Sequence, residues 1–242
     1  MDQIKQSRDS LTDQVERKLR QIILAGKIPP KTRLNIRILS EQLGTSVTPV
    51  REALMRLSAQ RIIDAQPGKF SMPDISRERY IEICNLRILL EGHAGEIAAT
   101  RITQKELLNI RSLAETYIQA VLKQDYALAV EHNARFKLAV FAAAHMPTLT
   151  ALIESLMLQV TPFFIASITP PPNTVPESPP FSVRYTTQIL EGLAVRDGQR
   201  VRHALQGMIL IGTERVMANL GNDSLRDTDG EESLFLKGAR LF

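Results

Sequence analysis

A helical repeat of apolar residues runs through almost the whole chain, and this repeat constrains the fold more than any other feature. Between Ser10 and about Ala25, apolar side chains recur every three or four positions, which predicts an amphipathic helix. Gly26 and Pro29-Pro30 follow. They end that helix, because proline lacks a backbone N–H and restricts the residue before it. The sequence therefore predicts a mainly α protein with sharp local stops.

Shorter elements follow this first helix. The pattern predicts helices at Ile36–Leu43 and Ser46–Ala59, joined by a very short turn. Ile62–Ala65 and Lys69–Met72 then flank the segment Gln66-Pro67-Gly68, which predicts a small β-hairpin with proline and glycine at its tip. Two helices at a tight turn followed by a hairpin are typical of a winged helix-turn-helix, whose second helix enters the major groove of DNA.

One segment of the second short helix makes this interpretation more specific. Residues 46–57 read SVTPVREALMRL, which resembles the recognition helix of GntR-type regulators. Residues 23–34 resemble the exit of that family's first helix, and Gly68 matches its wing glycine. The resemblance implies DNA binding by residues 1–73. It departs from the family at Val47, where most members have arginine, so a cation that could donate to guanine is missing.

Chemistry at the start of this helix supports the same role. Ser46 and Thr48 offer hydroxyls at a helix N-terminus, which suits a phosphate, and Arg51 lies one turn further along. We expect Ala53, Leu54 and Leu57 to pack inward. The predicted DNA contacts are Arg33, Arg37, Ser46, Val47, Thr48, Arg51 and Gly68. The alternative for the arginines is a solvated surface.

Charge is distributed unevenly along the chain. Residues 1–75 contain 13 Lys and Arg against 8 Asp and Glu, whereas the remainder contains 17 against 18. A basic first third suits a nucleic-acid partner, although so small a surplus also arises by chance. The single cysteine, Cys84, fits a core position in a reducing compartment, and no long apolar run or targeting segment is evident. We expect a cytoplasmic protein without a membrane partner.

Long amphipathic helices begin beyond Pro73, so we place a domain boundary near residues 73–76. An all-α bundle is predicted for 76–220, and a solvated C-terminal tail for 221–242. Residues 169–180 contain six prolines and are expected to form a loop. The predicted helices are 76–101, 104–124, 126–144, 148–168, 182–196 and 199–219.

The bundle sequence resembles the FCD domain, the effector domain of one GntR subgroup. The resemblance begins with Arg87, Leu90 and Glu91 and continues through Ala98-Ala99. In that domain one aspartate and three histidines hold a divalent metal, and here the aligned residues are Asn133, Lys137, Thr186 and Met208. An ammonium repels a cation and a thioether is a soft donor, so we predict no metal and no other cofactor.

Lys137 and Arg87 then suggest a different ligand. Two positive charges in a cavity need an acidic partner or an anionic ligand. One hypothesis is a small organic-acid effector held by Arg87 and Lys137, steadied by Asn133 and Thr186, and contacted by Met208. The alternative is that Arg87 pairs with Glu91 one turn away while Lys137 extends to solvent.

Together these features predict a DNA-binding transcriptional regulator, and more specifically a repressor. We expect a homodimer on double-stranded operator DNA, with the helical domain as the dimer surface and the linker Met72–Ser76 transmitting the effector signal. One alternative is an architectural DNA-binding protein without an effector. An enzyme is the other, and no catalytic motif supports it.

Overall fold

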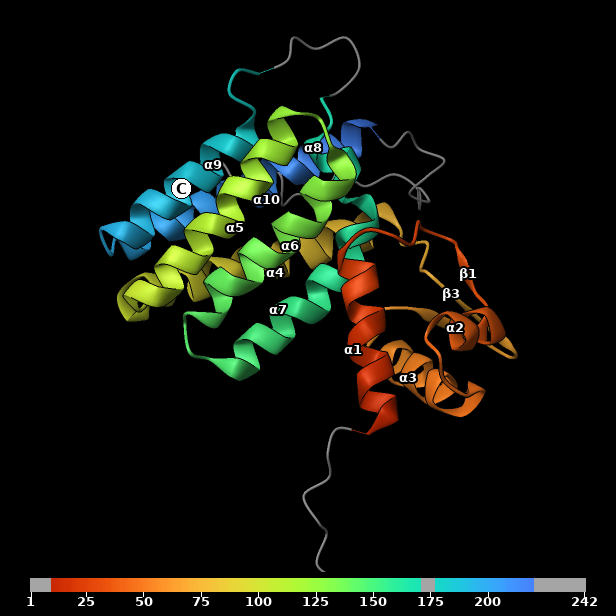
Figure 1. Ribbon diagram of the computed structural model, residues 1–242. Helices are drawn as coiled ribbons and strands as arrows, with labels where there is room; N and C mark the ends of the chain where they lie inside the picture. The colour runs from red at the N-terminus through yellow and green to blue at the C-terminus, as the bar shows by residue number, and fades with distance from the viewer. Residues whose placement is uncertain (1–9, 171–176, 220–242) are drawn as a thin grey trace, which may run out of the picture.

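The computed structural model describes residues 10–170 and 177–219. It is mainly α-helical and forms two lobes (Figure 1). The smaller lobe contains the N-terminal elements as a winged helix-turn-helix, and the larger one is an all-α bundle. The predicted fold class is confirmed. The tail predicted for 221–242 and residues 171–176 of the proline-rich segment lie outside the described residues.

The smaller lobe is built from three helices and a three-stranded antiparallel sheet in the order β1-β3-β2. Pro67-Gly68 forms the tip between β2 and β3, and Gly68 has φ +74°, a conformation that favours glycine. The elements are α1 (Leu11–Leu24), β1 (Arg33–Leu34), α2 (Ile36–Gln42), α3 (Val47–Ala59), β2 (Asp64–Gln66) and β3 (Lys69–Ser71).

Two details of this lobe differ from the prediction. The hairpin was expected to begin at Ile62, but β2 begins at Asp64, because Ile62 and Ile63 form a bend after α3 and are buried in the core. Strand β1 was not predicted. It consists of two residues that pair with Phe70 and Ser71, so it depends on a distant partner and leaves no periodic pattern.

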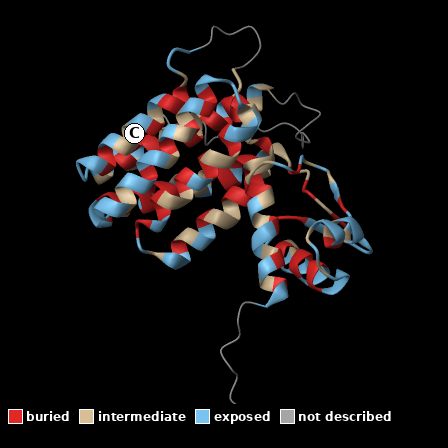
Figure 2. Ribbon diagram, viewed as in Figure 1, coloured by how far each residue is buried: buried red, intermediate tan, exposed pale blue. Residues whose placement is uncertain are grey.

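The larger lobe packs its helices around a continuous apolar core (Figure 2). Its helices are α4 (Arg77–Arg101), α5 (Gln104–Leu122), α6 (Tyr126–Ala142), α7 (Pro147–Val160), α8 (Phe164–Ile168), α9 (Phe181–Ala194) and α10 (Gly198–Asn219). Cys84 is buried, as expected, in a second apolar cluster with Tyr80 and Phe163. Thr103 and Glu106 form a capping box that fixes the start of α5.

The prediction of one helix over 148–168 is wrong. Helix α7 ends at Val160, a 3₁₀ turn covers Thr161–Phe163, and α8 follows. Pro162 lies in that turn and cannot donate the backbone hydrogen bond that a continuous helix needs. By length and composition the segment Pro147–Ile168 could cross a membrane, but half of it is buried within the bundle.

Helix α1 runs along the boundary between the two lobes (Figure 1). Gly26 follows it with φ +67°, and a Cβ at this position would lie 2.7 Å from Cγ1 of Val130 on α6. The lobes also meet through Arg20 and Glu154 at 3.9 Å and through Lys27 and Glu131 at 4.0 Å. The end of α1 therefore contacts the bundle directly.

Candidate functional sites

The first site is the outer surface of the smaller lobe, where α3 presents its N-terminal turn. Pro49, Val50, Ala53, Leu54 and Leu57 are buried and fasten the helix to the core, as the periodicity predicted for the last three. The side chains of Ser46, Val47, Thr48 and Arg51 remain exposed. Helical spacing thus separates a packing face from a free face.

Hydroxyls at this turn are available to a ligand. Ser46 occupies the N-cap position of α3, yet its side chain makes no capping hydrogen bond. Thr48 also makes no side-chain hydrogen bond within the described ranges. At a helix N-terminus, free hydroxyls and backbone N–H groups can donate hydrogen bonds to a phosphate oxygen.

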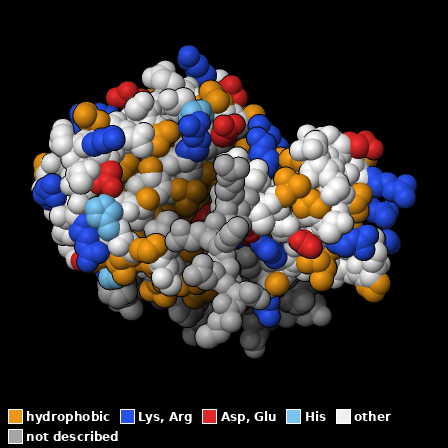
Figure 3. Space-filling view, turned by 60° about the horizontal axis from the view of Figure 1, so that its bottom comes forward, with side chains coloured by type: hydrophobic (Ala, Val, Ile, Leu, Met, Phe, Trp, Pro, Cys, Tyr) orange, Lys and Arg blue, Asp and Glu red, His pale blue; other side chains and the backbone are white. Residues whose placement is uncertain are grey.

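Cations gather on the same lobe. Figure 3 shows Lys and Arg side chains along its outer edge. The exposed cations between residues 33 and 69 without an ion-pair partner in the described part of the chain are Arg33, Arg37, Arg51, Arg61 and Lys69. Arg56 differs, because it pairs with Asp13 of α1 at 2.6 Å.

The seven predicted DNA-contact residues are all exposed and belong to β1, α2, the start of α3 and the wing. Arg37 is the second residue of α2, and its backbone N–H donates to the side chain of the N-cap residue Asn35 at 3.0 Å. Lys69 was not predicted. It directly follows the wing-tip Gly68, and its place beside a turn glycine could have identified it from the sequence.

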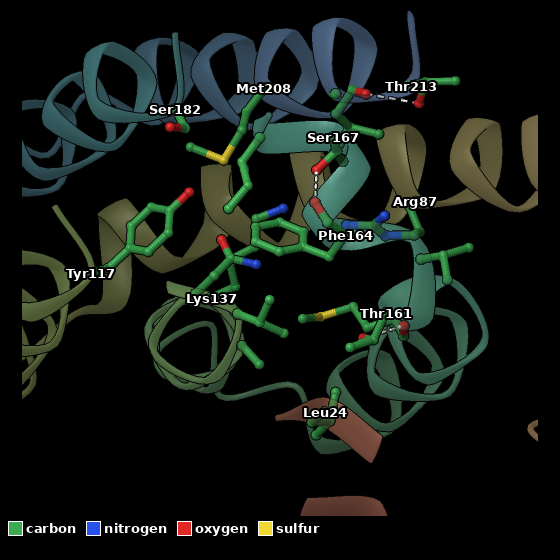
Figure 4. Close-up of a pocket in the computed structure, with 18 of the residues that line it drawn as sticks. Leu24, Arg87, Tyr117, Lys137, Thr161, Phe164, Ser167, Ser182, Met208 and Thr213 are labelled. Atoms are coloured by element: carbon green, nitrogen blue, oxygen red, sulfur yellow. Dashed lines mark hydrogen bonds between the residues drawn. The ribbon is translucent and has the colours of Figure 1, made fainter. Parts of the chain in front are cut away.

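The second site is a pocket inside the larger lobe, with a cavity volume of about 50 Å³ (Figure 4). Side chains from α4, α5, α6, α7, α8, α9 and α10 line it. A buried water needs roughly 10–15 Å³ of such volume, so the space suits a small molecule.

Four of the five predicted effector residues line this pocket, namely Arg87, Asn133, Lys137 and Met208. Thr186 is not among the lining residues. Its buried hydroxyl donates to the Ser182 carbonyl oxygen at 2.7 Å, as a helical threonine often does to the preceding turn. Tyr117 and Ser182, which the sequence did not single out, line the pocket instead.

Charge in the pocket is organised by Glu91. Its Oε1 accepts from Arg87 Nε at 2.6 Å, and its Oε2 accepts from Lys137 Nζ at 2.7 Å. The expected alternative for Arg87, pairing with Glu91, is therefore what the structure shows. Lys137 does not extend to solvent, because its side chain is 3% exposed and bonds to the same carboxylate.

Burial and charge act against each other on these groups. Burial disfavours the carboxylate of Glu91, but Arg87 and Lys137 outweigh this effect, so the pKa of Glu91 is lowered. Burial lowers the pKa of Lys137, and Glu91 offsets part of that change. The pocket thus sets two basic side chains, Arg87 and Lys137, against one carboxylate.

Three neutral polar atoms in the pocket wall lack a hydrogen-bond partner of normal geometry in the described residues. They are Tyr117 Oη, Asn133 Oδ1 and Ser182 Oγ, and all three residues are more than nine-tenths buried. Burial raises the pKa of Tyr117 above its usual value, although the nearby Ser182 lowers it slightly. Buried polar groups normally have hydrogen-bond partners, so three such atoms around one cavity give its wall a polar surface that suits a polar ligand.

A metal does not suit this pocket. Lys137 places an ammonium beside Glu91, and the Thr186 hydroxyl is engaged elsewhere. Among the described residues, no three His, Cys, Asp or Glu side chains converge. The donor set therefore does not fit a divalent ion.

Helix α1 reaches this pocket as well. Figure 4 shows Leu24 entering from α1 at the foot of the cavity, and Leu24 and Val130 both line it. At its other end, α1 holds α3 through Thr12 Oγ1 and Glu52 at 2.7 Å and through Asp13 and Arg56. One helix, α1, thus contacts both the pocket and α3.

Comparison with known proteins identifies a domain family for each lobe. The model of the bacterial regulatory proteins of the gntR family matches residues 11–69, and the FCD domain model matches residues 82–210. The HTH-type transcriptional regulator McbR of Escherichia coli (strain K12) is 36% identical over 154 residues, which cover 63% of this chain and 70% of McbR.

A probable D-xylose utilization operon transcriptional repressor of Paenarthrobacter nicotinovorans is 25% identical over 82% of this chain and 85% of its own. Among solved structures, E. coli McbR/YncC superposes with a TM-score of 0.76 at 30% identity, covering 86% of this chain and 97% of that one. The chain therefore belongs to the GntR family, with an FCD domain behind its helix-turn-helix, and is a transcriptional regulator rather than an enzyme.

Proposed function

We propose that this regulator is a cytoplasmic repressor that binds double-stranded operator DNA as a homodimer and loses affinity when a small organic acid enters the bundle pocket. The observation that carries the DNA-binding part is the free face of α3. There an arginine without an ion-pair partner in the described chain and two available hydroxyls extend from a firmly packed helix. Such a face suits base edges and phosphates together.

The roles on this face follow from chemistry. Ser46 and Thr48 contact a phosphate at the helix N-terminus, and Arg51 reaches a guanine edge or an adjacent phosphate. Val47 offers methyl groups to a thymine methyl. Arg37 and Arg33 neutralise backbone phosphates on either side, and the Gly68 wing tip approaches the neighbouring groove.

A twofold arrangement of two chains presents two recognition helices at one groove spacing, which is how helix-turn-helix dimers read near-palindromic sites. The bundle is the proposed dimer surface. An effector that prefers the arrangement with the wrong spacing lowers DNA affinity by its difference in affinity for the two arrangements.

The effector signal has two routes to the smaller lobe. The linker Met72–Ser76 was the expected one, and its Met72 and Ile75 are buried. Leu24 offers a more direct route, because it lines the pocket and belongs to the helix that holds α3. We propose that α1 carries most of the coupling.

The test of DNA recognition is fluorescence anisotropy with two labelled duplexes, the DNA upstream of the chain's own gene and a scrambled version of it. The full chain should prefer the upstream fragment. R51A should lose about 5- to 150-fold in affinity for it, which corresponds to about 1–3 kcal/mol for a guanine contact. R111A, which removes an exposed arginine of α5, is the matched control and should bind normally.

Two outcomes would contradict the proposal: equal affinity for both duplexes, or the same affinity loss in R51A and R111A. Equal, strongly salt-dependent affinity for both duplexes would instead favour an architectural DNA-binding protein.

A further inference from the structure

The pocket contains an uneven set of charges. Arg87, Glu91 and Lys137 form one bonded group in which a single carboxylate serves two cations. Their side chains are 12%, 0% and 3% exposed, so bulk water screens them weakly. Arg87 and Lys137 are the charged residues among the described ones that line the cavity. One positive charge therefore remains without a counter-charge.

Both cations still have donors to offer. Glu91 uses one N–H of Arg87, at Nε, and one of Lys137, at Nζ. A guanidinium and an ammonium each carry further N–H groups. No other protein acceptor takes these donors within the described ranges, and both side chains line the open cavity. The remaining donors and the remaining charge thus lie at the same place.

The other polar atoms of the wall are neutral. Thr161, Ser167 and Thr213 donate to backbone carbonyl oxygens three or four residues earlier, those of Met157, Phe164 and Ile209. Tyr117, Asn133 and Ser182 keep free polar atoms, but they add no charge. The rest of the described wall therefore adds no positive charge that could balance a second negative charge on a ligand.

We propose that this pocket selects its ligand by charge: it binds small monocarboxylates and discriminates against di- and tricarboxylates. A monoanion makes the buried group neutral, whereas a dianion leaves one uncompensated negative charge inside the bundle. Burying an unpaired charge is costly, so this difference decides which acid binds. The small cavity adds a limit on size. This inference rests on the proposed function and narrows it to one class of acid.

Glu91 is the residue that sets the preference. Replacing it with glutamine keeps the shape and an acceptor oxygen but removes one negative charge, so the pocket holds two positive charges. K137M instead leaves the neutral pair of Arg87 and Glu91. Charge selection therefore predicts that the preference for a monoanion over a dianion falls in E91Q and does not fall in K137M. Selection by size alone predicts the same preference in both variants.

The experiment is calorimetry on the full chain with ligand pairs of matched size, in which an uncharged amide replaces one carboxylate: malonamate against malonate, and succinamate against succinate. Ionic strength is held constant at a pH where both diacids are doubly ionised. In the native chain a monoanion should bind at least tenfold more tightly than its partner. E91Q should shift that ratio at least tenfold toward the dianion, and K137M should weaken the monoanion at least tenfold.

Three results would overturn the proposed charge selection. They are equal or tighter binding of the dianion by the native chain, an unchanged ratio of monoanion to dianion affinity in folded E91Q, and no heat of binding from either monoanion. Circular dichroism checks that the variants fold. If E91Q does not fold, the ratio in the native chain and the loss in K137M still decide the question. Because the DNA test with R51A uses no acid, failure of charge selection and failure of DNA recognition remain distinguishable.

Discussion

The two lobes use the same cationic side chains in opposite ways. On the smaller lobe, Arg37 and Arg51 are exposed, and no protein anion holds them in the described chain. In the bundle, the side chains of Arg87 and Lys137 are only 12% and 3% exposed, and both bond to Glu91. An exposed, unpaired arginine contributes little to folding stability and can bind a large polyanion such as DNA. A buried cation is paired with a carboxylate that the fold needs, and its remaining N–H groups can bind only a small anion. Environment, more than residue type, assigns the function.

The largest effect should come from removing the shared carboxylate. E91A leaves two cations buried without their partner, and breaking such a group costs about 3–5 kcal/mol. The free energy of unfolding, measured with urea, should fall by about that amount. E115A, which removes an exposed glutamate of α5, should change it by about 0.5 kcal/mol or less. Similar free energies of unfolding in E91A and E115A would mean that the buried charges of the bundle contribute no more to stability than an exposed charge does.

On the smaller lobe, replacing cations should leave stability nearly unchanged and weaken DNA binding. R37A and K69A should each reduce the slope of log affinity against log salt by about one, if each neutralises one phosphate. Anisotropy titrations at several salt concentrations measure that slope. R111A is again the control from the bundle, and a slope that changes equally in all three variants would place the DNA elsewhere.

The boundary between the lobes allows a matched glycine test. G26A and G44A both place a side chain at positive φ, with values of +67° and +63°, which costs about 1–2 kcal/mol. A Cβ at position 44 meets nothing within 4 Å, but at position 26 it meets Val130. We therefore expect G26A to cost about 1–3 kcal/mol more than G44A by urea unfolding.

V130A should recover much of that extra cost in the G26A background, because it removes the methyl group that would collide. If V130A restored no stability in the G26A background, the end of α1 would not pack against Val130 in the pocket wall. The proposed α1 route also predicts that folded G26A responds less to an acid in DNA-binding titrations than G44A does.

The smallest effect concerns an exposed ion pair of the smaller lobe. Hydrogen bonds from Ser10 and Arg56 lower the pKa of Asp13 to about 2 from 3.8. The folded state therefore gains stability above about pH 4, and this gain is lost as the pH falls toward about 2. D13N should flatten the stability profile in that window. E41Q, at an exposed glutamate of α2, should leave the profile unchanged.

Much of the fold could be predicted from the sequence, because each helix buries one stripe of apolar residues. The inward packing of Ala53, Leu54 and Leu57 followed from their spacing. The break near Pro162 was missed, although its cause is local, since proline cannot complete the backbone bonding of a helix.

The pocket was predictable only in part. Asn133 and Lys137 lie one helical turn apart, and resemblance to the FCD domain identified them. Two features depend on the tertiary fold: Glu91 accepts from Lys137, 46 residues away, and Leu24 enters from another lobe. A pattern along one helix does not contain such contacts.

The central claim is that an anion in the bundle changes DNA binding by the smaller lobe. Its most direct test is the affinity of the full chain for its upstream DNA, measured by anisotropy with and without each monocarboxylate of the panel. The account predicts a change of about 5- to 150-fold for at least one acid, the usual size of such coupling. It also predicts little or no change in K137M. An affinity that no acid alters, or that changes equally in K137M, would contradict it.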